Sequence, residues 1–134
     1  MTRRHDARRR AFDILYQADA SDRDPAEVLE ERSALGEGMN TFTRELVLGV
    51  AERMSELDAL IGAHAEGWTV TRLASVDRTL LRVACYEILH RDDIPTAVAI
   101  DEAVDAAKEL STERSGGFVN GILGKIARDH AGTA

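Results

Sequence analysis

Apolar residues recur every three or four positions along almost the whole chain, which is the spacing of one buried face of an α-helix. The pattern is longest from Thr41 to Ile61, where it predicts one long amphipathic helix. The apolar positions of this segment are Phe42, Leu46, Val50, Met54, Leu57 and Ile61. No segment alternates apolar and polar residues between hairpin turns, as a strand would. We therefore expect an all-α fold.

Glycine, proline and capping residues divide this pattern into six helices, or seven if residues 70–74 form a short turn of their own. Asp24 followed by Pro25 is typical of a helix start. Ser75 is a candidate cap for the most apolar helix, and Ser115 precedes the last one.

A length of 134 residues and an apolar share of 44% suit one compact domain that folds on its own. We expect two three-helix bundles that share a core, at roughly residues 1–67 and residues 68–134. The single cysteine, Cys85, excludes an internal disulfide, and no apolar run reaches the roughly 18 residues that cross a bilayer. We therefore expect a cytoplasmic protein without a membrane anchor.

Charge is distributed unevenly along the chain, whose formal net charge is -7. The first ten residues hold five arginines and one aspartate, a net charge of +4, so the rest of the chain carries -11. An acidic body repels a polyanion, and any nucleic-acid binding would therefore be local. A solvated basic arm that improves solubility is the alternative.

The first predicted helix adds two aromatic rings to this charge. On a helical wheel its small and apolar residues form one stripe, made of Ala7, Ala11, Ile14, Leu15 and Ala18. Arg9 lies opposite this stripe near Tyr16, and Phe12 lies between Arg8 and Tyr16. Guanidinium groups bind phosphates through paired hydrogen bonds, and rings stack on unpaired bases. The pattern favours single-stranded RNA, although both rings could instead pack beneath a neighbouring helix.

Nothing in the sequence indicates catalysis. The histidines are scattered without metal-ligand spacing, at His5, His64, His90 and His130. Cys85 lies within an apolar helix, where packing is its expected role. There is no glycine-rich phosphate loop, nucleophile elbow or paired-carboxylate pocket. We expect a protein that is not an enzyme and uses no metal or cofactor.

Four segments match a family pattern in the right order. The first segment supplies Arg4, Ala7, Arg8, Ala11, Leu15 and Tyr16. The second supplies Trp68, Arg72, Asp77, Arg78, Leu80, Leu81, Arg82, Ala84, Tyr86 and Glu87. The third supplies Ile94, Pro95, Val98, Ile100, Glu102, Ala103, Val104, Ala107 and Lys108, and the fourth Ser115, Phe118, Val119, Asn120, Gly121 and Leu123. Together these segments, which span nearly the whole chain, resemble the NusB family of bacterial transcription antitermination factors.

The resemblance implies an all-helical fold of two three-helix bundles that share a central helix pair. It implies binding to the single-stranded boxA element of ribosomal RNA leaders, jointly with the small-subunit ribosomal protein NusE. The complex would help RNA polymerase to read through terminators. The resemblance implies neither catalysis nor a cofactor.

For the RNA-binding surface, the resemblance implies five residues, namely Arg4, Arg8, Tyr16, Phe118 and Asn120. On charge and wheel position we add Arg3, Arg9 and Lys125. Two of these positions have another reading, because Phe118 could belong to the core and Asn120 could cap a helix or bond to the backbone.

Two positions depart from the family pattern. Asp101 replaces the usual Asn before Glu102, which could change the hydrogen bonding near that helix start. Gly124 stands where many members carry Asp, and the missing acid would favour RNA binding, while the glycine would loosen the last helix by about 1 kcal/mol.

Other functions remain open at this point. The chain could be a helical protein–protein adaptor whose arginines bind an acidic partner, or a detached NusB-like domain of an RNA cytosine methyltransferase. Relatives of the family occur as monomers and as dimers, so the sequence leaves a homodimer open.

Overall fold

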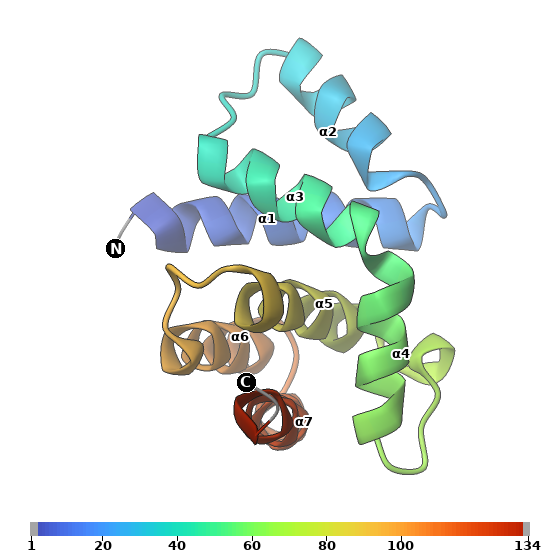
Figure 1. Cartoon of the computed structure of the whole chain (residues 1–134). Coiled ribbons are helices and arrows are strands. Elements are labelled where there is room, and N and C mark those ends of the chain that lie inside the picture. The colour runs from blue at the N-terminus through green and yellow to red at the C-terminus, as the bar shows by residue number, and fades with distance from the viewer. Residues whose placement is uncertain (1–2, 133–134) are drawn as a thin grey trace. The chain divides into compact units, whose positions relative to one another are not determined.

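The computed structural model describes residues 3–132 (Figure 1). Every regular element in that range is a helix, which confirms the all-α prediction. The elements are α1 (Arg3–Ala20), α2 (Pro25–Ala34), α3 (Thr41–Glu52), α4 (Met54–His64), the 3-10 turn η1 (Val70–Arg72), α5 (Ser75–His90), α6 (Thr96–Leu110) and α7 (Glu113–Gly132). No helix within these residues combines the length and the apolar character needed to span a bilayer.

The chain forms two compact units. The first unit ends at Arg53 and contains α1, α2 and α3, and the second begins at Met54 and contains the remaining helices. Helix α4 contacts α5 and α7. It therefore packs within the second unit, whereas the sequence placed residues 1–67 in one bundle.

The prediction of one long helix from Thr41 to Ile61 is wrong in one respect. The helix is interrupted at Arg53, which separates α3 from α4. The backbone of Arg53 has φ -114° and ψ 18°, and its N–H donates to the carbonyl of Val50, three residues back. The interruption takes a single residue, so the apolar spacing continues across it and the sequence pattern hides it. The sequence pattern therefore predicts one helix where the structure has two, α3 and α4, which pack in different units.

In the first unit the predicted apolar stripe of α1 is buried, which confirms the wheel. Asp24 caps α2 as predicted, because its side chain accepts a hydrogen bond of 3.0 Å from the backbone N–H of Ala26. Asn40 caps α3 in the same way. The buried hydroxyl of Thr43 donates to the Ala7 carbonyl at 3.0 Å and thereby ties α3 to α1.

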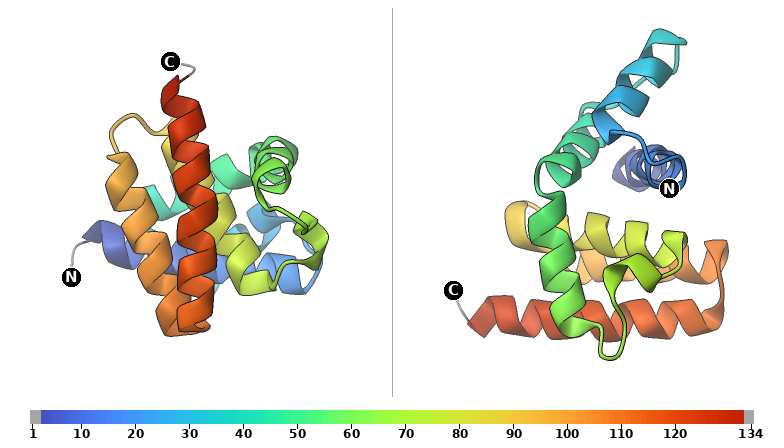
Figure 2. Two further views of the ribbon diagram at one scale, coloured as in Figure 1. Left: turned by 90° about the horizontal axis from the view of Figure 1, so that it is seen from below. Right: turned by 90° about the vertical axis from the view of Figure 1, so that its right-hand side faces the viewer.

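The second unit is built around α5, which contacts α4, α6 and α7. Helices α6 and α7 lie side by side (Figure 2), and they approach closely because α6 buries alanines and α7 carries Gly116 at the contact. Burial, with the nearby carboxylates of Glu56 and Asp58, raises the pKa of the Cys85 thiol to about 12. Since the thiolate is the reactive form, Cys85 acts as a packing residue, as predicted.

Two helix starts in the second unit differ from the sequence prediction. Ser75 is the first residue of α5, and Ala74 rather than Ser75 occupies the cap position. Helix α7 begins two residues before Ser115, because the Thr112 hydroxyl accepts a hydrogen bond of 3.0 Å from the Ser115 N–H. Ser115 therefore lies in the first turn of α7, where its hydroxyl contacts Asp77 of α5.

Candidate nucleic-acid interface

The arginines of α1 are not equally exposed. Arg3 and Arg4 are exposed and Arg9 is half-buried, whereas Arg8 retains only 8% of its accessible surface. The guanidinium carbons of Arg4 and Arg8 lie 4.6 and 5.3 Å from the centre of the Phe42 ring. A cation over an aromatic face is attracted by the ring quadrupole. Phe42 of α3 therefore orders two arginines of α1.

The aromatic rings of α1 have separate environments. Phe12 is 6% exposed, so the alternative that it packs in the core is the correct one for this ring. Tyr16 is 38% exposed and stacks on Phe12 with the ring centres 5.7 Å apart and the planes at 17°. One face of Tyr16 is thus covered by Phe12, and part of the residue remains accessible on the same helix as the arginines.

A small pocket of about 270 Å³ lies beside Arg3 in the first unit. Arg10 shares this pocket with Asp6 and lies 3.9 Å from a carboxylate oxygen of Glu37. The carboxylates of Asp6 and Glu37 offset part of the positive charge. Arg10 therefore contributes less to the exposed basic surface than its position in the sequence indicates.

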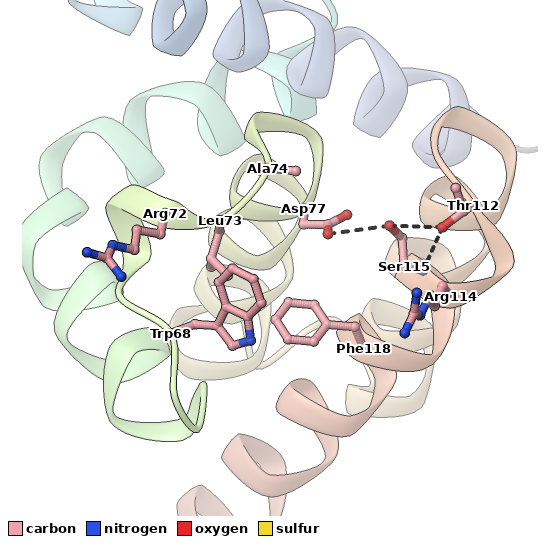
Figure 3. Close-up of a pocket in the computed structure, with 9 residues that line it drawn as sticks. All are labelled: Trp68, Arg72, Leu73, Ala74, Asp77, Thr112, Arg114, Ser115 and Phe118. Carbon is pink, nitrogen blue, oxygen red and sulfur yellow. Dashed lines mark hydrogen bonds between the residues drawn. The ribbon is translucent and has the colours of Figure 1, made fainter.

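The second unit contains a larger pocket, of about 660 Å³, between the loop after α4, the start of α5 and the start of α7 (Figure 3). Two rings, Trp68 and Phe118, point toward one another across it. Trp68 is 52% exposed and Phe118 is half-buried. Two exposed arginines, Arg72 and Arg114, lie on opposite sides of the pocket. Aromatic rings beside cationic groups are the combination that binds unpaired nucleotides.

Asp77 of α5 also lines this pocket and is 8% exposed. Its Oδ2 accepts a hydrogen bond of 3.4 Å from the Ser115 hydroxyl, and its Oδ1 is shielded from solvent without a hydrogen-bond partner. Burial raises the pKa of the Asp77 carboxyl above its usual range, and the Ser115 hydroxyl partly counteracts this shift. Asp77 is therefore a carboxyl group with unused capacity to accept hydrogen bonds.

The loop that carries Trp68 and Arg72 is held in place by Arg78. Its Nη1 donates to the backbone carbonyls of Val70 and Leu73 at 3.0 and 2.9 Å. The guanidinium group thus closes the η1 turn against α5, and the pocket wall is formed before any ligand binds.

The residues that the sequence placed near the C-terminal end of the chain do not share one face of α7. Asn120 is two residues beyond Phe118, so the two side chains point in nearly opposite directions on the helix. Asn120 is exposed in the interior of α7, where it cannot cap the helix. Lys125 shares the face of Phe118, and its Nζ lies 3.4 Å from Oε1 of Glu66. Only Phe118 among the three lines the pocket.

Sequence reasoning missed four functional candidates, namely Phe42, Trp68, Asp77 and Arg114. Phe42 was identified only as a core position, and the ring contacts with arginines of another helix could not be read from spacing. A signal for Trp68 was available in the sequence, because it is the single tryptophan of the chain. The structure adds that Trp68 is exposed. Asp77 and Arg114 come together with it only through the packing of α5 and α7.

Comparison with known proteins identifies the family. The NusB family profile matches residues 5–128. A NusB structure from T. maritima is 40% identical, with a TM-score of 0.85, and the match covers 97% of this chain and 94% of that one.

Two further solved structures agree with this match. The solution structure of NusB from Aquifex aeolicus is 29% identical, with a TM-score of 0.78 and coverage of 100% of this chain and 93% of that chain. A crystal structure of the antitermination factors NusB and NusE in complex with dsRNA contains a chain that is 28% identical, with a TM-score of 0.84 and coverage of 96% and 99%. With four motifs, an all-helical fold and a profile match over almost its whole length, the chain belongs to the NusB family.

Proposed function

We propose that this protein is a transcription antitermination factor that binds the single-stranded boxA element of ribosomal RNA leaders together with the ribosomal protein NusE. In this role it acts in the cytoplasm, within a complex that helps RNA polymerase to read through terminators. It contributes binding surfaces and performs no catalysis. The observation that carries the proposal is membership of the NusB family over residues 5–128.

The geometry of the first unit supports RNA binding. Arg3 and Arg4 are exposed residues whose guanidinium groups can bind phosphates, and Phe42 restricts the orientation of Arg4. A guanidinium group that is already oriented loses less conformational freedom when it binds a phosphate. Arg9 and Tyr16 extend the same helix as further contacts. Arg8 is buried, so we assign it mainly to ordering this surface and to the local positive potential.

The geometry of the second unit supplies a different kind of contact. Trp68 and Phe118 offer rings on which unpaired bases can stack, and Arg114 adds a cation beside them. We include Asn120 and Lys125 as contacts at the edge of this unit, on α7. Since Lys125 lies near Glu66, its contribution to RNA binding should be smaller than that of Arg4.

A related structure favours a protein partner as well as RNA. That complex holds NusB and NusE with double-stranded RNA, and the match to it covers 96% of the present chain and 99% of the matched chain. The acidic remainder of the present chain would attract a basic ribosomal protein and repel RNA from other surfaces. We therefore propose NusE as the protein partner and a single-stranded boxA RNA as the nucleic acid.

A competition experiment tests this function. Labelled boxA RNA is bound to the full chain, with and without purified NusE, and is displaced by unlabelled boxA RNA or by a scrambled RNA of the same composition. We expect boxA RNA to displace the label at lower concentration than the scrambled RNA, and NusE to tighten binding. Equal displacement by both RNAs would contradict the proposal and favour a protein–protein adaptor. Size-exclusion chromatography of the protein with and without boxA RNA would show whether a homodimer forms and whether it dissociates when RNA binds.

A further inference from the structure

The pocket of the second unit is lined by a carboxylate, that of Asp77, which base stacking on Trp68 and Phe118 would not use. A binding site made only of rings and arginines would accept any base, because every base has an aromatic face. Asp77 adds a carboxylate that is almost entirely buried and lacks partners for Oδ1. A buried carboxylate without enough donors is unfavourable, and a ligand that supplies donors would remove this cost. The placement of Asp77 thus indicates a ligand with N–H groups at its edge.

The charges around the pocket discriminate between two kinds of donor. A lysine or arginine of a partner protein could donate to Asp77 and stack on Trp68. However, Arg72 and Arg114 also line the pocket, so the lining carries more positive than negative charge. A second cation would be repelled, whereas a nucleotide brings a neutral base for Asp77 and a phosphate for the arginines. The charge pattern therefore favours a nucleotide.

The hydrogen-bonding groups of the four bases indicate which nucleotide fits the Asp77 carboxylate. A carboxylate only accepts hydrogen bonds, and its two oxygens can take two neighbouring donors. Guanine presents two adjacent donors on its Watson–Crick edge, N1–H and the 2-amino group. Adenine and cytosine place an acceptor nitrogen beside their amino group, and uracil flanks its N–H with two carbonyls, so each of them turns an acceptor toward the carboxylate.

We propose that Asp77 makes this pocket a guanine-selective subsite, in which the base stacks on Trp68 and donates from its Watson–Crick edge to the Asp77 carboxylate. The inference rests on the proposed function, because it assumes that single-stranded RNA is the ligand. The 3.4 Å contact from Ser115 is at the outer limit of a hydrogen bond and yields to the incoming donors. In this subsite the Asp77 side chain rotates away from Ser115, which turns the shielded Oδ1 toward the base. Arg114 and Arg72 then lie at the rim, where the adjoining phosphates pass.

Trp68 provides a direct measurement, because it is the only tryptophan of the chain and lies in the pocket. The full-length protein is titrated with single-stranded octauridylates that carry one central guanosine, inosine or adenosine, and quenching of tryptophan fluorescence is followed. We expect the guanosine RNA to bind about tenfold more tightly than the adenosine RNA, the discrimination typical of one bidentate contact. Inosine, which lacks the 2-amino group, should fall between them.

Asp77→Asn is the decisive variant. Its amide offers one acceptor and one donor, which suits adenine better than guanine. We expect the variant to lose the guanosine preference and to bind the adenosine RNA at least as tightly. Asp101→Asn, an exposed change on α6 that removes the same charge, should leave the preference intact. Arg4→Gln should weaken both RNAs by the same factor.

The outcomes separate this inference from the proposed function. Wild-type protein that binds boxA RNA but shows equal affinity for guanosine and adenosine would overturn the guanine subsite and leave the function standing. Failure to bind any RNA, or quenching by a lysine-rich peptide instead, would overturn the function itself. Since the wild-type comparison with inosine needs no substitution, the inference can be refuted even if Asp77→Asn does not fold.

Discussion

At the scale of single residues, Asp77 combines a stability cost with the binding role that we propose for it. Its carboxyl is 8% exposed, and burial raises its pKa because the charged form loses its hydration. The Ser115 hydroxyl is the polar group that contacts the carboxyl, whereas Arg72 and Arg114 line the same pocket on opposite sides. Arg78, which follows Asp77 in the chain, donates to backbone carbonyls. A group retained at such a cost is typical of a binding site, where function opposes stability.

Replacing Asp77 should therefore stabilise the fold. A pKa that is higher in the folded state than in the unfolded state means that the ionised carboxyl destabilises the fold at neutral pH, and that this penalty disappears as the pH falls below the unfolded-state value. We expect Asp77→Asn to raise the free energy of unfolding by about 1 kcal/mol at pH 7. The gain should shrink in acid, where the wild-type carboxyl is protonated. Urea denaturation at several pH values measures this, and a loss of stability at pH 7 would contradict it.

At the scale of elements, the glycines of α7 serve different purposes. A Cβ added at Gly116 would lie 2.7 Å from Cγ of Lys108, so this glycine lets the stem of a lysine on α6 cross α7 closely. At Gly117 a Cβ would meet no atom within 4 Å. Gly124 is intermediate, because its added Cβ would lie 3.4 Å from Nη1 of Arg128. Only the first of these glycines is required by packing.

Adjacent alanine substitutions test this difference. Gly117→Ala should stabilise the protein by up to about 1 kcal/mol, because alanine has a higher helix propensity and meets open space. Gly116→Ala should gain nothing or destabilise, since the Lys108 stem must move. The two variants differ by one position in the same helix, so each is a control for the other in thermal unfolding. A stabilising Gly116→Ala would show that the close contact with Lys108 is unimportant.

At the scale of the whole molecule, the uneven distribution of charge limits where a polyanion can bind. A basic stretch of ten residues with net charge +4 belongs to a chain whose remainder carries -11. Such a chain binds a polyanion only where its cations are exposed, and binding weakens as salt competes for the phosphates. The structure further divides the arginines of α1 into exposed ones, such as Arg4, and a buried one, Arg8.

Salt dependence of boxA binding tests this view. Each phosphate contact on single-stranded RNA adds about -0.7 to the slope of log affinity against log salt concentration. Arg4→Gln should lower the affinity and flatten the slope by about 0.7. Arg23→Gln is a matched control, because Arg23 belongs to the same unit, lies outside the basic stretch of the first ten residues and pairs with Glu31. An unchanged slope for Arg4→Gln would show that Arg4 does not contact a phosphate.

Much of the fold could be predicted from the sequence, because helices depend on local periodicity and local caps. The stripe of α1 and the Asp24 cap are of this kind, and both are confirmed. The interruption at Arg53 could not be predicted, since one non-helical residue leaves the apolar spacing unchanged. The true start of α7 was also hidden, because Thr112 and Ser115 are equally good capping residues.

For the candidate site, the sequence by itself determined which chemical groups are present and that they resemble those of the NusB family. It identified the arginines of α1 and the ring of Phe118 because residue type and helical spacing are local properties. Tertiary packing alone decided that Phe42 lies against Arg4 and Arg8, and that Trp68, Asp77 and Phe118 line one pocket. Burial, pairing and exposure depend on contacts between helices that are far apart in the sequence, and no local sequence pattern encodes such contacts.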